Sequence, residues 1–351
     1  MKIAVLMGGL SGEREVSLAS GVQVARALRK SGHEVLSVDT GRGVLSPGEE
    51  AAILDSGVQA PCPPSELHDL VQAGGVGFLN EDPRLGGVEV VFPALHGGRG
   101  EDGTIQTLLE LRGLPFVGSD RVGCALAMDK DLSKRLLRDA GVATPEWITV
   151  EGREEAEERL DEIVRKLGLP LIVKPPSGGS TLGLTLVREE RELSDALSDA
   201  LRHEDRVLFE RYVKGREVTV GILGEEALPV GEIIPDHELF DYECKYRPGM
   251  AQEIFPAELP SALAARISEE ALKVHRVLRL RDFSRVDFIL DASGNSWCLE
   301  ANALPGLTGT SLIPKAAKAA GITFPELCHR MALMALERGS GARRSRGFEG
   351  R

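Results

Sequence analysis

Apolar residues along the chain follow two periodicities. Continuous apolar runs predict buried strands at residues 2–7, 34–39 and 88–95. Between the first two runs, apolar residues recur at the spacing of a helix, at Leu18, Val22, Ala25 and Leu28. Gly32 follows as a helix stop. Strands that alternate with helices predict an α/β domain with a parallel sheet at the start of the chain.

The same pattern predicts where this first domain ends. A second helix is expected after Gly103, with an apolar face at Ile105, Leu108 and Leu109. A short strand at 114–118 then completes a first domain at residues 1–121. Residues 46–66 are rich in Pro, Gly and Glu, and we expect them to form an excursion on the surface.

From residue 122 onward the pattern predicts α+β structure. Helices are expected at 129–140, 154–167 and 192–204, and strands near 144–150, 169–174, 183–187 and 206–213. Later come strands at 217–223 and 227–235, a helix at 261–279 and a hairpin at 283–302. We divide this part into domains at 122–213 and 214–335, with a disordered tail at 336–351. The long irregular loop at 236–256 predicts a functional lid.

Composition narrows the class of protein. The 351 residues are enough for about two domains, and a net charge of -12 argues against a nucleic-acid or anionic-membrane partner. Five scattered cysteines without a Cys-x-x-Cys pair argue against a disulfide framework or a zinc site. No apolar stretch is long enough for a signal peptide or a membrane span. We therefore expect a cytoplasmic protein with reduced thiols.

The densest group of polar residues is the hairpin at 283–302. Alternate residues of a strand share a face, so Arg285 and Asp287 point one way, and so do Glu300 and Asn302. If both sets face one cleft, the two carboxylates and the amide suit Mg²⁺, with a nucleotide phosphate completing the shell. Arg285 would then act as an anion clamp. A solvated polar face on an edge hairpin explains these residues equally well.

A second candidate is "LIVKPPSGGSTLGLTLV" at 171–187, which predicts a strand, a glycine-rich turn and a second strand. The chain contains no G-x-x-x-x-G-K-[ST] sequence, so this is not a P-loop. Lys174 can still neutralise phosphates while the turn at 178–183 covers them with its amides. Tight turns account for most glycine-rich hairpins, and Lys130 in "AMDKDLSKRLL" is equally consistent with a surface helix.

Between these segments lies a possible nucleotide-binding connector. Glu210, Arg211 and Val213 are expected where a strand runs into the next domain, and their backbone can hydrogen-bond an adenine edge. Glu217 can accept both ribose hydroxyls. A solvated strand end is the simpler interpretation of this segment alone.

The first loop poses a different problem. "KIAVLMGGLSGEREVSLAS" at 2–20 has the strand, glycine turn and helix of a phosphate site, but the turn carries Glu13 and Glu15. A carboxylate repels phosphate, so these residues either cap the helix or hold a cationic ligand.

Seven motifs in a fixed order connect these segments. They are "GGLSGEREVSLASG" (8–21), "HGGRGEDGTIQ" (96–106), "AMDK" (127–130), "VKP…GSTLG" (173–183), "FDYECKY" (240–246), "RVDF" (285–288) and "LEANALPGLTGTSLIP" (299–314). Together they resemble the D-alanine–D-alanine ligase family of the ATP-grasp superfamily, over residue 2 to about 335. The resemblance implies an N-terminal Rossmann-like (pre-ATP-grasp) domain followed by a two-lobed ATP-grasp fold.

The resemblance also implies the reaction. ATP phosphorylates one D-alanine, a second D-alanine attacks the D-alanyl phosphate, and the dipeptide serves peptidoglycan synthesis. Two Mg²⁺ (or Mn²⁺) ions, cytoplasmic location and a homodimer are expected. The carboxylates of Asp287 and Glu300, together with the amide of Asn302, would bind the metal ions. The nucleotide would contact Lys130, Lys174, Ser180, Glu210, Arg211, Val213, Glu217 and Lys245.

For the two amino acids, the resemblance implies a separate set of residues. Glu15 would face the first ammonium, with His96 nearby, and Tyr246 and Ser180 would lock the lid to this loop. Arg285 and the Gly306 amide would stabilise the oxyanion. Ser311 and the Leu312 amide would bind the second carboxylate.

Two alternatives stay open at this stage. A ligase that uses D-lactate or D-serine as second substrate would share these motifs, although Tyr246 favours the dipeptide over a D-lactate product. A nucleotide-binding or amino-acid-binding regulator without catalysis would be expected to lack Lys174, Arg285, Glu300 or Asn302, and all four are present.

Overall fold

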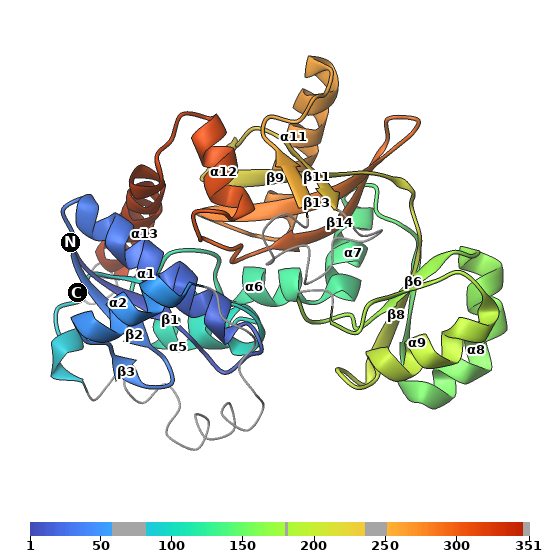
Figure 1. Cartoon of the computed structure of the whole chain (residues 1–351), viewed down its shortest axis with the longest axis horizontal. Coiled ribbons are helices and arrows are strands. Elements are labelled where there is room, and N and C mark those ends of the chain that lie inside the picture. The colour runs from blue at the N-terminus through green and yellow to red at the C-terminus, as the bar shows by residue number, and fades with distance from the viewer. Residues whose placement is uncertain (58–81, 180–181, 236–250, 347–351) are drawn as a thin grey trace.

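Three sheets organise the molecule (Figure 1). The computed structural model describes residues 1–57, 82–179, 182–235 and 251–346. The N-terminal sheet and its helices form one end of the molecule, the central sheet forms the other, and the C-terminal sheet lies between and above them in this view (Figure 1). Within the described residues, no helix is both long enough and apolar enough to cross a membrane.

The N-terminal sheet confirms the expected parallel α/β start. Its strand order is β3 (Gly43–Val44), β2 (Glu34–Asp39), β1 (Lys2–Met7) and β4 (Val90–Pro93). The central strand β1 is parallel to both β2 and β4, while the short β3 is antiparallel to β2. Helices α1 (Arg14–Lys30) and α13 (Phe324–Arg346) cover one face, where Ile3, Val5 and Met7 are buried. Ala4 and Leu6 face the other way, toward α5 (Thr104–Leu111).

Two segments of this domain differ from expectation. The surface excursion expected at 46–66 begins with a helix, α2 (Pro47–Ser56), because Ser46 and Glu49 form a capping box around its first turn. Residues 58–66 lie outside the described part. The strand expected at 114–118 is reduced to a parallel bridge between Phe116 and Val91.

The disordered tail expected at 336–351 is wrong as far as Arg346, because α13 continues to that residue. Leu327, Met331 and Ala335 recur at helical spacing and are fully buried against the N-terminal domain. Arg338 then fixes the helix, since its Nη2 donates to the Phe116 carbonyl at 2.8 Å and to Asp282 Oδ2 at 2.9 Å.

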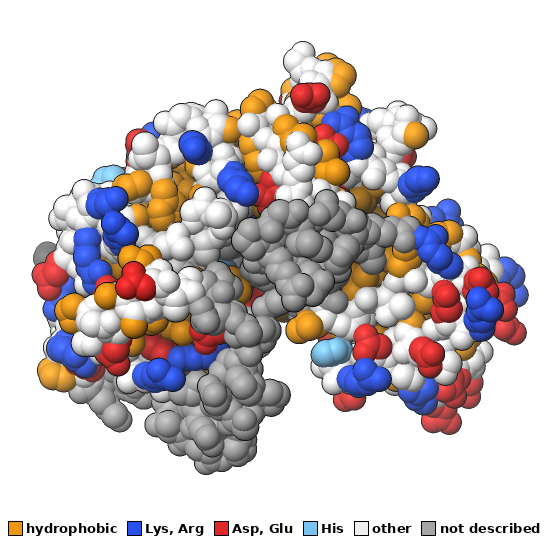
Figure 2. Space-filling view, viewed as in Figure 1, with side chains coloured by type: hydrophobic (Ala, Val, Ile, Leu, Met, Phe, Trp, Pro, Cys, Tyr) orange, Lys and Arg blue, Asp and Glu red, His pale blue; other side chains and the backbone are white. Residues whose placement is uncertain are grey.

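The central sheet is antiparallel and has one apolar face. Its order is β5 (Trp147–Glu151), β8 (Arg206–Arg211), β6 (Leu171–Lys174) and β7 (Thr185–Val187), and α8 (Gly152–Leu167) and α9 (Leu193–Ala200) cover it. Val173 and Phe209 pack beneath these helices, so Lys174 and Glu210, one position further along each strand, face the opposite side. Lysines, arginines and acids cover the outer surface of this lobe (Figure 2).

The C-terminal sheet has the order β12 (Ala251–Ile254), β11 (Gly231–Pro235), β9 (Gly215–Leu223), β13 (Phe283–Asp291) and β14 (Ser296–Asn302), with β10 (Glu226–Ala227) on β9. One face packs on α6 (Arg121–Met128), α7 (Lys130–Asp139) and α11 (Ser261–Val277). Helix α12 (Leu312–Ala319) lies on the other face, where Ile313 approaches Gly221. The loop expected at 236–256 thus includes a strand at its end, while 236–250 is outside the described residues.

Candidate active site

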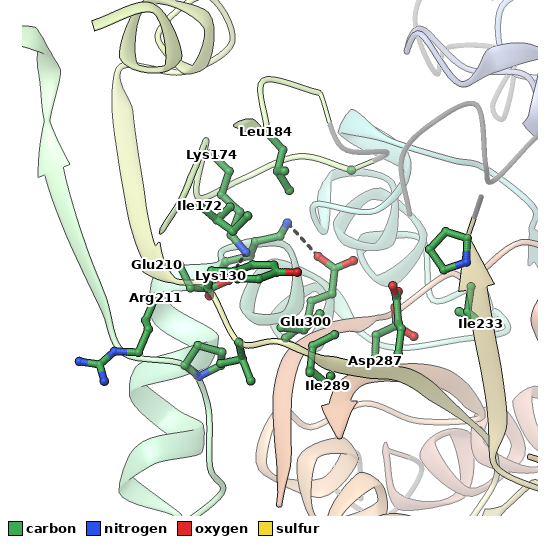
Figure 3. A pocket seen from close by; sticks show the side chains of 18 of the residues that line it. Lys130, Ile172, Lys174, Leu184, Glu210, Arg211, Ile233, Asp287, Ile289 and Glu300 are labelled. Carbon is green, nitrogen blue, oxygen red and sulfur yellow. Dashed lines mark hydrogen bonds and ion pairs between the residues drawn. The ribbon is translucent and has the colours of Figure 1, made fainter. Parts of the chain in front are cut away.

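A cavity of about 520 Å³ lies between the central and C-terminal sheets (Figure 3). Tyr212 and Val213 line it where the chain passes from β8 to β9, as expected for a connector between two lobes. Charged side chains also converge on it, namely Lys130, Lys174, Glu210, Glu217, Arg285, Asp287 and Glu300. The structure therefore brings together most of the residues that the sequence predicted for nucleotide and metal binding.

Two of the predicted lysines reach the cavity from different elements. Lys174 ends β6, and its Nζ donates to Glu210 Oε1 at 2.8 Å. Lys130 begins α7, and its Nζ donates to the Gly178 carbonyl at 2.8 Å and lies 3.2 Å from Glu300 Oε2 (Figure 3). Lys130 thus connects the glycine-rich turn to the hairpin. Neither lysine is a solvated surface residue, since both are at least nine-tenths buried.

A third lysine, Lys134, was missed by the sequence interpretation. Its Nζ lies 2.6 Å from Glu210 Oε2 and donates to the Pro145 carbonyl at 3.2 Å and to Thr144 Oγ1. Its side chain is fully buried, and this burial lowers the pKa of Lys134. Burial alone would raise the pKa of Glu210, but Lys134 and Lys174 outweigh it and lower that pKa.

The hairpin presents its oxygen atoms to the cavity because of a bulge. Asp287 pairs with Glu300, but the next residue, Phe288, pairs with Cys298, so the register shifts by one at Leu299. In a regular strand Cys298 and Glu300 would share a face. The bulge lets Cys298 enter the apolar core while Glu300 faces the cavity.

Asp287 is held by side chains from three directions. It accepts hydrogen bonds from Thr219 Oγ1 at 2.6 Å, from Arg285 Nη2 at 2.8 Å and from Asn302 Nδ2 at 3.0 Å. The sequence prediction that these hairpin residues share one cleft is confirmed for Arg285, Asp287 and Glu300, which line the cavity, and Asn302 contacts Asp287 beside them. The solvated edge hairpin is excluded, since Asp287 is buried.

In the predicted nucleotide connector, the side chain of Arg211 points away from the cavity and only its backbone remains at the connector. Arg211 points its guanidinium away from the cavity (Figure 3), where Nη2 pairs with Glu146 Oε2 at 2.5 Å and donates to the Lys166 carbonyl at 3.1 Å. Only the backbone of Arg211 is therefore placed where the sequence predicted a nucleotide contact. Glu217 lines the cavity, as expected for a ribose contact.

The acidic turn near the N-terminus lies close to the glycine-rich turn. A Cβ atom at Gly97 would lie 2.7 Å from Glu13 Oε2, and one at Gly179 would lie 3.4 Å from the same oxygen. Glu13, which the sequence analysis noted with Glu15 but to which the resemblance gave no role, therefore faces Gly179 of the glycine-rich turn. Glu15 lies in the first turn of α1 and is partly buried.

A buried ion pair fixes the shape of this turn. Arg14 Nη1 donates to Asp39 Oδ1 at 2.9 Å and to the Gly9 carbonyl at 3.1 Å, and Arg14 is only 2% exposed. Gly8 is required here, because it has a φ of 80° and any Cβ would meet both partners of the pair. The positions of Glu13 and Glu15 are thus set by buried contacts.

His96 lies against the same turn. Its Nε2 is 3.1 Å from Ser20 Oγ and its Nδ1 is 3.5 Å from Glu101 Oε1, while its carbonyl accepts from Ser11 Oγ at 2.5 Å. Both ring nitrogens have protein partners. The structure therefore supports His96 as a residue that shapes the turn.

The residues predicted for the second amino acid lie in one turn before α12. Ser311 is the N-cap, but its Oγ accepts from the Thr308 amide at 3.0 Å and makes no capping bond to the helix. A Cβ at Gly306 would lie 2.8 Å from the same Oγ. The first amides of α12, including that of Leu312, therefore have no side-chain cap and suit a carboxylate.

Ser180, Lys245 and Tyr246 lie outside the described residues, so their expected roles remain predictions. The remaining predicted residues gather at three places, which are the cavity, the turns of the N-terminal domain around Glu15 and His96, and the turn before α12.

Comparisons with known proteins agree with this arrangement. The family models "D-ala D-ala ligase N-terminus" and "D-ala D-ala ligase C-terminus" match residues 2–119 and 136–332. A D-alanine--D-alanine ligase of Moorella thermoacetica is 39% identical over 343 residues, covering 96% of this chain and 100% of that protein.

Two solved structures share the fold. The D-alanine-D-alanine ligase from Coxiella burnetii has a TM-score of 0.80 at 27% identity and covers 99% of this chain and 98% of its own. VanG D-Ala:D-Ser ligase from Enterococcus faecalis has a TM-score of 0.78 at 31% identity, with coverages of 95% and 99%. The chain therefore belongs to the D-alanine–D-alanine ligase family, as its motifs predicted.

Proposed function

We propose that this ligase joins two D-alanines to D-alanyl-D-alanine in the hollow between its lobes, through D-alanyl phosphate, with ATP converted to ADP. The observation that carries the proposal is the cavity itself, where buried Lys130 and Lys174 face the carboxylates of Asp287 and Glu300. The product is a building block for peptidoglycan.

The first step demands concentrated positive charge. The D-alanine carboxylate must approach the γ-phosphate of ATP, and two anions repel each other strongly in a poorly solvated site. Lys130 and Lys174 would contact the phosphates and cancel this repulsion. Lys245 is expected to add a third cation. The adenine would lie against the backbone of Glu210, Arg211 and Val213, with the ribose on Glu217.

The oxygen atoms of Asp287, Glu300 and Asn302 would hold the divalent ions. Two carboxylates and one amide oxygen match the hard ligands that Mg²⁺ and Mn²⁺ accept, with phosphate oxygens and water completing the shell. The Asn302 amide already donates its Nδ2 to Asp287, which leaves its oxygen directed elsewhere. When bound, the ions would offset phosphate charge and polarise the transferred group.

The first D-alanine would be bound by the acidic turn. An ammonium needs a carboxylate, and Glu13 faces Gly179 of the glycine-rich turn, so Glu13 is proposed for this contact alongside Glu15, which the resemblance implies. His96 would keep the turn in place. The expected contacts of Ser180 and Tyr246 would link this turn to the lid.

The second D-alanine would bind beside α12. Ser311 and the Leu312 amide would fix its carboxylate and leave its amine free to attack the acyl phosphate. A negative oxygen develops on the tetrahedral carbon, and Arg285 with the Gly306 amide would stabilise it. Loss of one such donor typically slows a reaction by about 10²–10³.

The test is D-alanine-dependent release of ADP in Mg²⁺ and ATP, with the product identified by mass. D-alanine alone is compared with D-alanine plus D-lactate and D-alanine plus D-serine, because one similar structure is that of a D-Ala:D-Ser ligase. We expect D-alanyl-D-alanine to dominate in all three. A dominant mixed product would overturn the second-substrate assignment, and no turnover by folded, ATP-binding protein would overturn the ligase assignment.

The homodimer and the cytoplasmic location implied by the resemblance also remain proposals. Light scattering after size exclusion would test the first, with twice the 37.7 kDa chain mass as the expected result.

A further inference from the structure

We propose that Lys134 is a positioning residue for ATP, because it neutralises Glu210 and so leaves the charge of Lys174 available to the phosphates. The inference rests on the proposed binding of ATP in the cavity. Lys134 itself does not line that cavity, so it acts through its neighbours.

Glu210 lies between the two lysines. Lys174 Nζ contacts Oε1 at 2.8 Å, and Lys134 Nζ contacts Oε2 at 2.6 Å, so each carboxylate oxygen has its own cation. The three side chains are 9% exposed or less. Water therefore screens these charges weakly, and each one strongly affects the others.

The balance of charge decides what Lys174 can do. Two cations and one anion leave a net positive charge at this end of the cavity. Without Lys134, Glu210 and Lys174 would form a neutral pair, and Glu210 would compete with phosphate for the same ammonium group. Lys134 thus supplies the excess positive charge, although Lys174 is the lysine that would contact the phosphates.

The position of Lys134 is rigidly determined. It follows Lys130 by one helical turn on α7, so a single helix places one lysine in the cavity and one behind it. Lys134 Nζ lies 5.2 Å from the centre of the Trp147 ring. Trp147 Nε1 in turn donates to Asp131 Oδ1 at 2.7 Å, which ties β5 to α7.

A purely structural role is a poor explanation for this arrangement. A buried set of paired charges usually gives a folded protein no more stability than apolar side chains of similar volume would. Of the three residues, Lys174 and Glu210 line the cavity, and Lys174 is the cation that a phosphate would contact there.

The test compares binding of MgATP and of adenosine by titration calorimetry. The variants are Lys134→Met, Lys174→Met, the double variant Lys134→Met/Glu210→Gln, and Lys166→Met as a control at an exposed lysine. Lys134→Met should weaken MgATP binding by about 10- to 100-fold and leave adenosine binding within about twofold. The double variant, which loses one charge of each sign, should recover most of the MgATP affinity.

Steady-state kinetics give a second readout. The KM for ATP should rise in Lys134→Met while the KM values for D-alanine stay near the wild-type values. Equal loss of ATP and adenosine binding, or no recovery in the double variant, would overturn the inference and leave Lys134 as a structural residue. If Lys134→Met does not fold, the double variant still decides, since it must bind MgATP nearly as wild type.

The outcomes separate this inference from the proposed function. Failure of wild type to bind MgATP, or full affinity in Lys174→Met, would contradict the nucleotide site itself. Weak binding in Lys174→Met together with wild-type binding in Lys134→Met would contradict only the role of Lys134.

Discussion

The two walls of the cavity differ in net charge. The positive wall, formed by the central sheet and the start of α7, brings Lys174 and Lys130 with one acid, Glu210. The negative wall, formed by the C-terminal sheet, brings four acids, Glu217, Glu232, Asp287 and Glu300, with two arginines, Arg216 and Arg285. The positive wall is supported by a buried network of charges around Glu210, and the negative wall by a strand bulge that redirects one residue.

The difference in net charge suits each wall to a different part of the proposed ligand. Phosphate oxygens need cations, and metal ions need oxygen ligands, so the proposed ATP–metal complex would place its phosphates toward the positive wall and its metal ions toward the negative wall. Lys130 joins the walls, since its Nζ lies 3.2 Å from Glu300 Oε2. A metal ion and a phosphate bound between the walls would separate this ion pair.

The largest expected effect comes from the negative wall. Glu300→Gln removes the charge of a proposed metal ligand and should lower kcat/KM by about 10³-fold, because a bound metal ion typically supplies several kcal/mol of transition-state stabilisation. The concentration of Mg²⁺ needed for half-maximal rate should rise as well. Initial rates over a Mg²⁺ series measure both.

Glu226→Gln is the matched control, because Glu226 is an exposed acid on β10 of the same sheet. It should behave as wild type. An unchanged Mg²⁺ requirement in Glu300→Gln would contradict the assignment of this wall to metal binding.

The positive wall predicts a different signature. Lys174→Met removes the cation proposed to contact the phosphates and should lower kcat/KM for ATP by about 10²–10³-fold. Its Mg²⁺ requirement should change much less than that of Glu300→Gln. Rates over a matrix of ATP and Mg²⁺ concentrations distinguish the two variants, and equal responses would erase the distinction between the walls.

The opposite side of the C-terminal sheet provides a pH test of stability. His275 on α11 is buried and its Nδ1 lies 2.7 Å from Ser284 Oγ. Burial lowers its pKa from 6.5 to about 4, opposed in part by Glu225. The unfolded chain therefore binds a proton below pH 6.5 that the folded chain takes up only near pH 4.

The sign follows directly. His275 should make the free energy of unfolding fall as the pH drops, by about 2 kcal/mol between pH 7 and pH 5. Urea unfolding of His275→Asn should show that much less pH dependence than wild type, while His203→Asn, at an exposed histidine, should keep the full slope. Identical slopes in wild type and His275→Asn would contradict the buried neutral imidazole.

The smallest expected effect separates two neighbouring acids. Glu13→Gln should raise the KM for the first D-alanine about tenfold, the typical contribution of a hydrogen bond to a charged group. Glu15→Gln should raise it less, because Glu13 lies nearer to the glycine-rich turn. A larger effect from Glu15→Gln would restore the original assignment.

Local signals account for most of the fold that was predicted. Apolar runs predicted β1 and β2 to the residue, and helical spacing predicted α1, α7 and α8. Helix α2 was missed although Ser46 and Glu49 have capping-box spacing, since Pro and Gly were taken as signs of a loop. Helix α13 was not predicted, and its last turns depend on distant partners, such as Asp282 for Arg338.

The site shows the same limit. Alternation in the hairpin predicted that Arg285 and Asp287 share a cleft, but no local signal marks the bulge at Leu299. Lys134 resembles a surface lysine in sequence, and only Glu210, from a strand of another sheet, reveals why it is buried. The roles of such residues depend on contacts between segments distant in the sequence, so residue spacing does not predict them.

The central claim is that the two walls allow the carboxylate of D-alanine to attack the γ-phosphate of ATP. The most direct test uses D-alanine labelled with ¹⁸O in its carboxylate and measures the label in the released phosphate by mass spectrometry. Attack through D-alanyl phosphate predicts one ¹⁸O atom transferred to phosphate for each dipeptide formed. Dipeptide formation with unlabelled phosphate would contradict the claim.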